Sequence, residues 1–146
     1  MKLYLMRHGQ AASPQVDPQR GLTSAGRHEV EQLARRLQAR GIHFEQVFHS
    51  EKARAQQTAE IMSGILAPEV TPRVHKGMRP DDDPSLLWPE IESWQQDTLI
   101  ASHLPFVPNL LITLTGQPPG VAMVPGTIIC LQKDSDDWRI AWLESP

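Results

Sequence analysis

The sequence contains one cysteine, Cys130, which cannot form a disulfide within the chain. It also lacks an excess of basic residues, since 14 Lys and Arg stand against 17 Asp and Glu, for a formal net charge of -3. A lone cysteine gives no sign of an oxidising compartment, and a nucleic-acid binder usually carries a basic surface. We therefore expect a cytoplasmic protein that does not bind nucleic acid.

Long apolar runs are missing as well. The first run, over residues 3–6, ends at Arg7 and is too short for a signal peptide or a membrane span. We therefore expect no targeting segment and no contact with a membrane. A chain of 146 residues, 40% of them hydrophobic, has the size and composition of one globular domain, and no linker or repeat divides it. The sequence predicts a single domain over residues 1–146.

Apolar runs alternate with helical repeats along the chain. Short runs over residues 3–6, 45–49, 69–74 and 98–101 predict strands. Helical spacing predicts helices that begin at Thr23 or Ser24, at a capping Ser50, at Pro84 and at Pro105. Residues 127–131 and 138–142 flank a polar stretch, as a terminal hairpin or two sheet strands would. This order predicts an α/β fold, a single three-layer α/β/α domain with a mostly parallel central sheet.

Parallel sheets with helices on both faces bind ligands at the carboxyl ends of their strands. Basic side chains follow the predicted strands at these ends. Arg7 and His8 come after the first strand, Arg54 lies inside the helix that Ser50 opens, and His103 follows the fourth strand. Two guanidinium groups beside helix N-termini form a site for a dianion, and a phosphoryl group is its natural ligand. No Gly-rich phosphate loop with its lysine and no metal-ligand spacing occurs, so we expect chemistry without a metal ion or cofactor.

The two histidines suggest how a phosphoryl group would be transferred. A neutral imidazole can attack phosphorus, and nearby arginines disfavour its protonated form, so His8 is the predicted nucleophile. A second imidazole can donate hydrogen bonds to the oxygens that carry negative charge in the transition state, and His103 fits this role.

The residues that carry this chemistry lie in four short segments. In chain order they are LYLMRHG at 3–9, RGLTSAG at 20–26, SEKARAQQTA at 50–59 and SHLP at 102–105. They resemble the histidine phosphatase superfamily, also called the phosphoglycerate mutase-like or RHG family. The short length and the Ser-His-Leu-Pro segment resemble its SixA group of phosphohistidine phosphatases.

The resemblance implies a phosphoglycerate mutase-like fold and a phosphatase that acts on phosphohistidine in signalling phosphotransfer proteins. It implies that His8 is the phosphorylated nucleophile and His103 the second histidine. It also implies that Arg7 and Arg54 are phosphate ligands and that Arg20 is an additional residue of the pocket.

The sequence departs from the superfamily in the proton donor. Larger members place a glutamate after the third strand, within long insertions, whereas here the available acids are Asp81, Asp82 and Asp83, with Asp17 as a rival. Imidazole can leave phosphohistidine as a neutral group once its ring is protonated, so a weak or absent acid favours N–P substrates. Missing insertions also predict a shallow pocket that accepts a histidine on a protein surface.

Two other functions are compatible with these residues. One is a broad phosphatase of small phosphomonoesters, which would prefer a sugar phosphate to a phosphohistidine protein. The other is a non-catalytic module that binds phosphoproteins without releasing phosphate; the two arginines and two histidines together argue against it.

Overall fold

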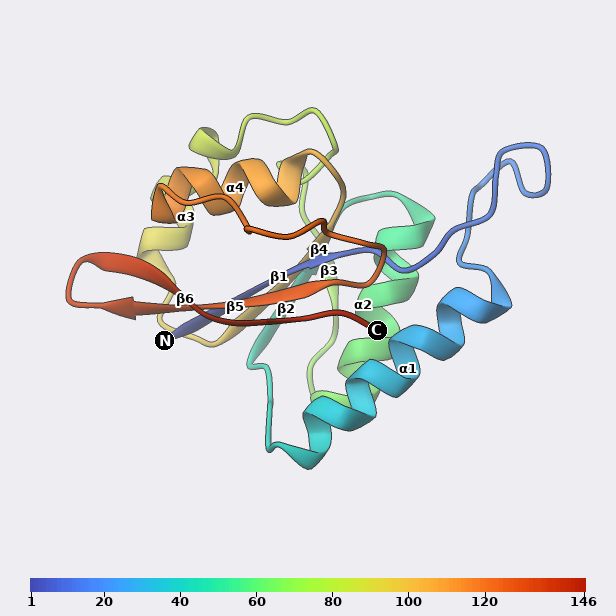
Figure 1. Ribbon diagram of the computed structural model, residues 1–146, viewed down its shortest axis with the longest axis horizontal. Coiled ribbons are helices and arrows are strands. Elements are labelled where there is room, and N and C mark those ends of the chain that lie inside the picture. Colours follow the sequence, from blue (N-terminus) through green and yellow to red (C-terminus); the bar gives the residue numbers. More distant parts are fainter.

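The computed structural model describes all residues from Met1 to Pro146. Its centre is a six-stranded sheet in the order β3-β2-β4-β1-β5-β6 (Figure 1). The strands are β1 (Lys2–Arg7), β2 (Gln46–His49), β3 (Arg73–Val74), β4 (Thr98–Ser102), β5 (Ile128–Asp134) and β6 (Asp137–Glu144). The first four run parallel, and β5 and β6 add an antiparallel hairpin beside β1. The predicted α/β fold with a mostly parallel sheet is confirmed, and the last two strands form both a hairpin and part of the sheet.

Helices cover both faces of the sheet, which gives three layers (Figure 1). On one face lie α1 (Ser24–Ala39) and α2 (Ala53–Leu66); on the other lie the 3-10 turn η1 (Pro84–Leu86), α3 (Trp88–Ser93) and α4 (Phe106–Thr115). Successive side chains of a strand point to opposite faces. Tyr4 and Met6 of β1 therefore pack under α1 and α2, whereas Leu3 and Leu5 pack under α3 and α4.

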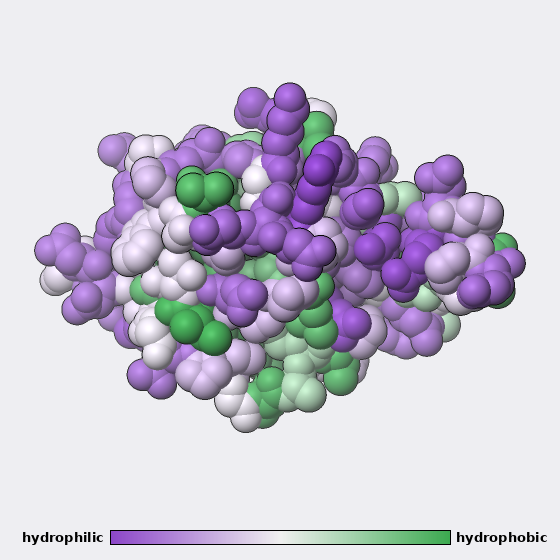
Figure 2. Space-filling view, turned by 90° about the horizontal axis from the view of Figure 1, so that it is seen from above, coloured by the Kyte–Doolittle hydropathy of each residue, from purple (hydrophilic) through white to green (hydrophobic).

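The outer surface over α3 and α4 is mostly hydrophilic. Figure 2 looks onto this side, where hydrophobic residues gather toward the lower middle of the view and otherwise form small patches. Trp88 of α3 and Ile112 of α4 are among the exposed ones, while Ile91 and Leu110 of the same helices are fully buried. The apolar stripe of each helix thus faces the sheet. No helix in the structure is both long and apolar enough to span a bilayer.

Strand register brings the predicted site residues together. In the parallel pair of β1 and β4, Arg7 lies opposite Ser102, so the next residue of each strand, His8 and His103, leaves the sheet at the same edge. The backbone N–H of His8 donates to the carbonyl of Ser102 at 2.9 Å. On the other side of β4, the N–H of Ser50 donates to the carbonyl of Ala101 at 3.2 Å.

Ser50 does not cap α2, contrary to the prediction from the sequence. The helix begins at Ala53, with Lys52 at the capping position and no side-chain cap bond. Ser50 is the first residue after β2 and is still bonded to the sheet, so the chain needs two more residues to turn into the helix. The hydroxyl of Ser50 lies instead at the ring of His103.

Two other elements also differ from the prediction. The strand expected over residues 69–74 is the two-residue β3, which is exposed at the edge of the sheet. The helix expected over residues 84–94 is divided into η1 and α3. Pro89 lies in the first turn of α3, where a missing N–H is tolerated, but it cannot continue a helix that began before it.

Candidate active site

His8 occupies the tight turn after β1 and is buried. Its Nδ1 lies 2.7 Å from the carbonyl oxygen of Gly9. A carbonyl can only accept, so Nδ1 carries the hydrogen and Nε2 keeps its lone pair. Burial, and then the charges of Arg54 and Arg7, lower the pKa of His8 to about 4. At neutral pH this ring is therefore uncharged, with a free lone pair on Nε2, which is the form a nucleophile needs.

His103 follows β4 and lies beside His8, with 5.1 Å between the ring centroids. It is 2% exposed. Its Nε2 lies 2.6 Å from Oγ of Ser50, whereas its buried Nδ1 has no hydrogen-bond partner. Burial, and then His8 and Arg54, lower the pKa of His103 to about 3. Both imidazoles are thus neutral at neutral pH.

The two arginines bring positive charge to these rings without a compensating acid. Arg7 ends β1 and donates from one terminal nitrogen to the carbonyl of Met123 at 2.8 Å; Arg54 lies in the first turn of α2. Neither guanidinium forms an ion pair with a carboxylate. Such free cationic forks are suited to bind an anion.

Three buried side-chain polar atoms in the whole molecule have no hydrogen-bond partner. They are Nε of Arg7, Nε of Arg54 and Nδ1 of His103. Buried polar groups are nearly always satisfied in folded proteins, so an unpaired one calls for an explanation. All three belong to residues that the sequence places in the site, and the two arginine Nε–H groups are donors that lack an acceptor.

Arg20 lies with these residues. It has a left-handed backbone, with φ of 51°, and its Nε donates to the carbonyl of Ala12 at 3.0 Å. Its charge contributes to the lowered pKa values of both His8 and His103. Arg20 and Arg54 line a surface hollow of about 570 Å³, which also includes Glu51 and Lys52. The structure therefore brings all five site residues predicted from the sequence to one place.

Three of the four acids considered as proton donors accept hydrogen bonds within their own loops. Asp17 accepts from the backbone N–H groups of Gln19 and Gly21 at 3.0 and 2.9 Å, and so holds the loop that presents Arg20. Asp82 accepts from the N–H of Arg79 at 2.8 Å. Asp83 accepts from the N–H and the hydroxyl of Ser85. Asp81 is exposed.

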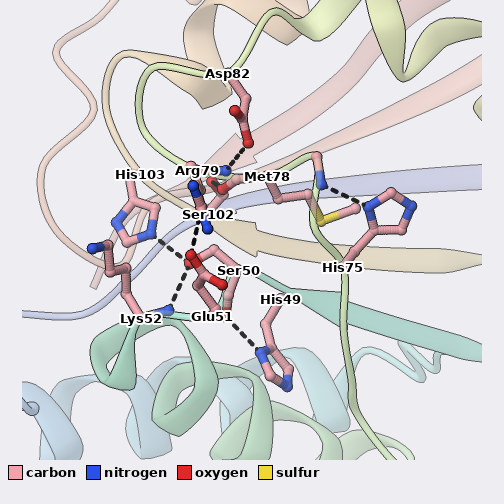
Figure 3. Close-up of polar contacts among 11 residues, drawn as sticks. His49, Ser50, Glu51, Lys52, His75, Met78, Arg79, Asp82, Ser102 and His103 are labelled. Carbon is pink, nitrogen blue, oxygen red and sulfur yellow. Dashed lines mark hydrogen bonds and ion pairs between the residues drawn. The ribbon is translucent and has the colours of Figure 1, made fainter.

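Four contacts around the site were not predicted from the sequence. Thr58, expected only as part of the buried stripe of α2, accepts from the N–H of Gly9 at 3.0 Å and donates to the carbonyl of Arg54 at 2.8 Å. It thus joins the turn that carries His8 to α2. Ser50 contacts His103, and Glu51 pairs with Arg79 at 2.5 Å (Figure 3). A buried threonine among apolar helix positions was the only signal that the sequence offered.

Comparison with known proteins agrees with this geometry. Residues 3–79 match the histidine phosphatase superfamily (branch 1). The chain belongs to this superfamily. The chain is 33% identical over 123 residues to an uncharacterised protein of Picosynechococcus, covering 82% of this chain and 67% of that one. It is 28% identical over 152 residues to the phosphohistidine phosphatase SixA of Escherichia coli K12, covering 100% and 94% of the two chains.

A solved structure of a histidine phosphatase is also similar. The protein histidine phosphatase SixA complexed with tungstate superposes with a TM-score of 0.89 and 28% identity, over 99% of this chain and 97% of that chain. The resemblance to the SixA group and the prediction of a hydrolase are therefore confirmed.

Proposed function

We propose that this protein removes the phosphoryl group from a phosphorylated histidine phosphotransfer protein, through a phosphohistidine intermediate on His8. The observation that carries the proposal is the set of three unpaired buried donors on Arg7, Arg54 and His103. A phosphoryl group offers three equatorial oxygens to such donors, and its charge needs the two free guanidinium groups. The 28% identity to proteins named as phosphohistidine phosphatases supports the choice of substrate.

The reaction needs two displacements at phosphorus. In the first, the lone pair on Nε2 of His8 forms a bond to phosphorus while the N–P bond of the substrate breaks, and the electron pair goes to the leaving ring. A proton already on that imidazole lets it depart uncharged. In the second, water attacks phosphorus, the bond to His8 breaks, and phosphate leaves. Arg7, Arg54 and His103 stabilise the oxygens in both steps.

The surroundings of the site support a protein substrate. The hollow beside Arg20 and Arg54 is on the surface, where a protruding phosphohistidine could enter. Asp17, Asp82 and Asp83 accept hydrogen bonds within their own loops, and an N–P bond needs less help from an acid than a phosphomonoester. We place the reaction in the cytoplasm, since the lone Cys130 is buried and unpaired.

Phosphate release from a ³²P-labelled histidine phosphotransfer domain tests the mechanism. We expect His8→Ala to abolish release, because the nucleophile is lost, and His28→Ala, an exposed histidine of α1, to retain it. Mass spectrometry of enzyme quenched at alkaline pH during turnover should find phosphate on His8. Full activity of His8→Ala would refute the mechanism.

The same assay separates the alternatives. A strong preference for a sugar phosphate over the phosphoprotein would favour a broad phosphatase of small phosphomonoesters. Tight binding of the phosphoprotein with no release near neutral pH would favour a binding module.

A further inference from the structure

Ser50 holds one nitrogen of His103 in a fully buried contact. The residue is 0% exposed, and its Oγ lies 2.6 Å from Nε2 of His103. The backbone N–H of Lys52 points to the same oxygen at 3.3 Å. Figure 3 shows Ser50 between the His103 ring and the start of α2. No other partner contacts this hydroxyl.

These two partners determine where the hydroxyl hydrogen goes. The N–H of Lys52 can only donate, so it takes a lone pair of the Ser50 oxygen and offers no acceptor. The one acceptor within reach of the Ser50 hydroxyl is therefore Nε2 of His103. If Nε2 carried the hydrogen instead, the Ser50 hydrogen would be buried without a partner, which costs free energy.

We infer that the Ser50 hydroxyl donates to Nε2 of His103 and so fixes the tautomer that carries its hydrogen on Nδ1. Ser50 is then a positioning residue for the reaction. The tautomer itself is inferred from the contacts of Ser50, and only its effect on catalysis rests on the proposed function. Because the ring is neutral, with a pKa of about 3, it carries one hydrogen, and the choice of tautomer decides what it can do. The Nδ1–H becomes a donor beside the Nε–H groups of Arg7 and Arg54.

The two histidines of the site then share one tautomer and have opposite roles. In His8 the Nδ1–H is used by the carbonyl of Gly9, which frees the Nε2 lone pair for attack. In His103 the Nε2 lone pair is used by Ser50, which frees Nδ1–H to donate to a phosphoryl oxygen. With the other tautomer, His103 would present a lone pair to the anion and repel it.

The tautomer can be measured without any assay of activity. Long-range ¹H–¹⁵N correlation spectra of ¹⁵N-histidine-labelled protein distinguish protonated from unprotonated ring nitrogens, and His103→Gln identifies the signals. We expect the hydrogen of His103 on Nδ1 in the wild type. In Ser50→Ala neither ring nitrogen keeps a partner, so the preference for Nδ1 should be lost and a protonated Nε2 signal should appear, whereas Ser50→Thr should retain the wild-type pattern. A hydrogen on Nε2 in the wild type overturns the inference, whatever the substrate is.

Ser102→Ala is the matched control. Ser102 is also fully buried and precedes His103, but its hydroxyl donates to the carbonyl of Met78 at 2.6 Å. Its loss should leave the His103 tautomer unchanged.

Kinetics give a second readout. If the proposed substrate is turned over, Ser50→Ala should lower kcat about 10- to 100-fold with a smaller change in KM, because the lost donor acts on the transition state. Ser50→Thr should restore most of kcat. An unchanged tautomer and full kcat in Ser50→Ala would overturn the inference. No turnover by the wild type, with the predicted tautomer present, would instead count against the proposed function.

Discussion

His8 and His103 are buried as neutral rings beside arginines without carboxylate partners, and this arrangement costs stability. A cation without a carboxylate partner is costly inside a protein, since burial lowers the pKa of both Arg7 and Arg54. An anion that fills the pocket supplies the missing acceptors. The proposed binding of a phosphoryl group would therefore offset a cost that these residues impose on the fold.

Acid should destabilise the protein through His8 before any carboxylate is protonated. The ring binds a proton with a pKa of about 6.5 when unfolded, but with a pKa of about 4 when folded. Between these values the unfolded state holds more protons, so the free energy of unfolding falls as the pH is lowered. At pH 5 this effect costs about 2 kcal/mol relative to pH 7, and above pH 6.5 it vanishes.

Urea unfolding of the wild type and of His8→Gln at pH 7 and pH 5 measures this effect. The variant cannot titrate at this position, so it should lose about 2 kcal/mol less than the wild type between the two pH values. Equal losses in both proteins would show that His8 titrates normally when folded.

Two helices contact the turn that carries His8. From α2, Thr58 accepts from the N–H of Gly9. From α1, Gly26 packs against the backbone of Gln10 so closely that a Cβ at Gly26 would lie 2.2 Å from the carbonyl oxygen of Gln10. Glycine at this position is required by the close approach of a helix to the turn.

Gly26→Ala and Gly64→Ala should change stability in opposite directions. Both residues lie in helices, where alanine is favoured over glycine by about 1 kcal/mol. A Cβ at Gly64 meets nothing within 4 Å, so Gly64→Ala should stabilise by that amount. Gly26→Ala must displace the backbone at Gln10 and should destabilise by about 1–3 kcal/mol. Thermal unfolding compares them, and stabilisation by both alanines would disprove the close contact.

The whole molecule has two hydrophobic cores, one on each face of a shared sheet. The strands contribute alternate side chains to each core, so neither core can form without the sheet. We therefore propose that residues 1–146 unfold as one cooperative unit.

Leu33→Ala and Leu110→Ala test this cooperativity. Both leucines are 0% exposed, Leu33 in the core under α1 and α2, and Leu110 in the core under α3 and α4. Each substitution should lower the free energy of unfolding by about 2–5 kcal/mol. Urea unfolding should show a single transition with an unchanged slope in both variants. Two separate transitions in either variant would mean that the faces unfold independently.

Local patterns were enough to predict most elements and the main site residues. Buried strands such as β1 and β4 are uninterrupted apolar runs, and His8 and His103 stand directly after them. Contacts between elements could not be predicted in this way. The hydroxyl of Ser50 meets His103 only because β2 lies beside β4, and the position of Arg20 depends on a left-handed turn held by Asp17. No pattern near Ser50 or Arg20 specifies those neighbours.

The central position of β1 has a consequence for the synthesis of the protein. His8 directly follows β1, but β1 is completed by β4 on one side and by β5 on the other, and both strands come later in the sequence. The hydrogen bond from the Arg7 side chain to the carbonyl of Met123 also forms only after residue 123 has been made. During synthesis the chain therefore carries His8 before His103 and the two strands that flank β1 have been made, so the pairing around β1 can be completed only after β5 has emerged.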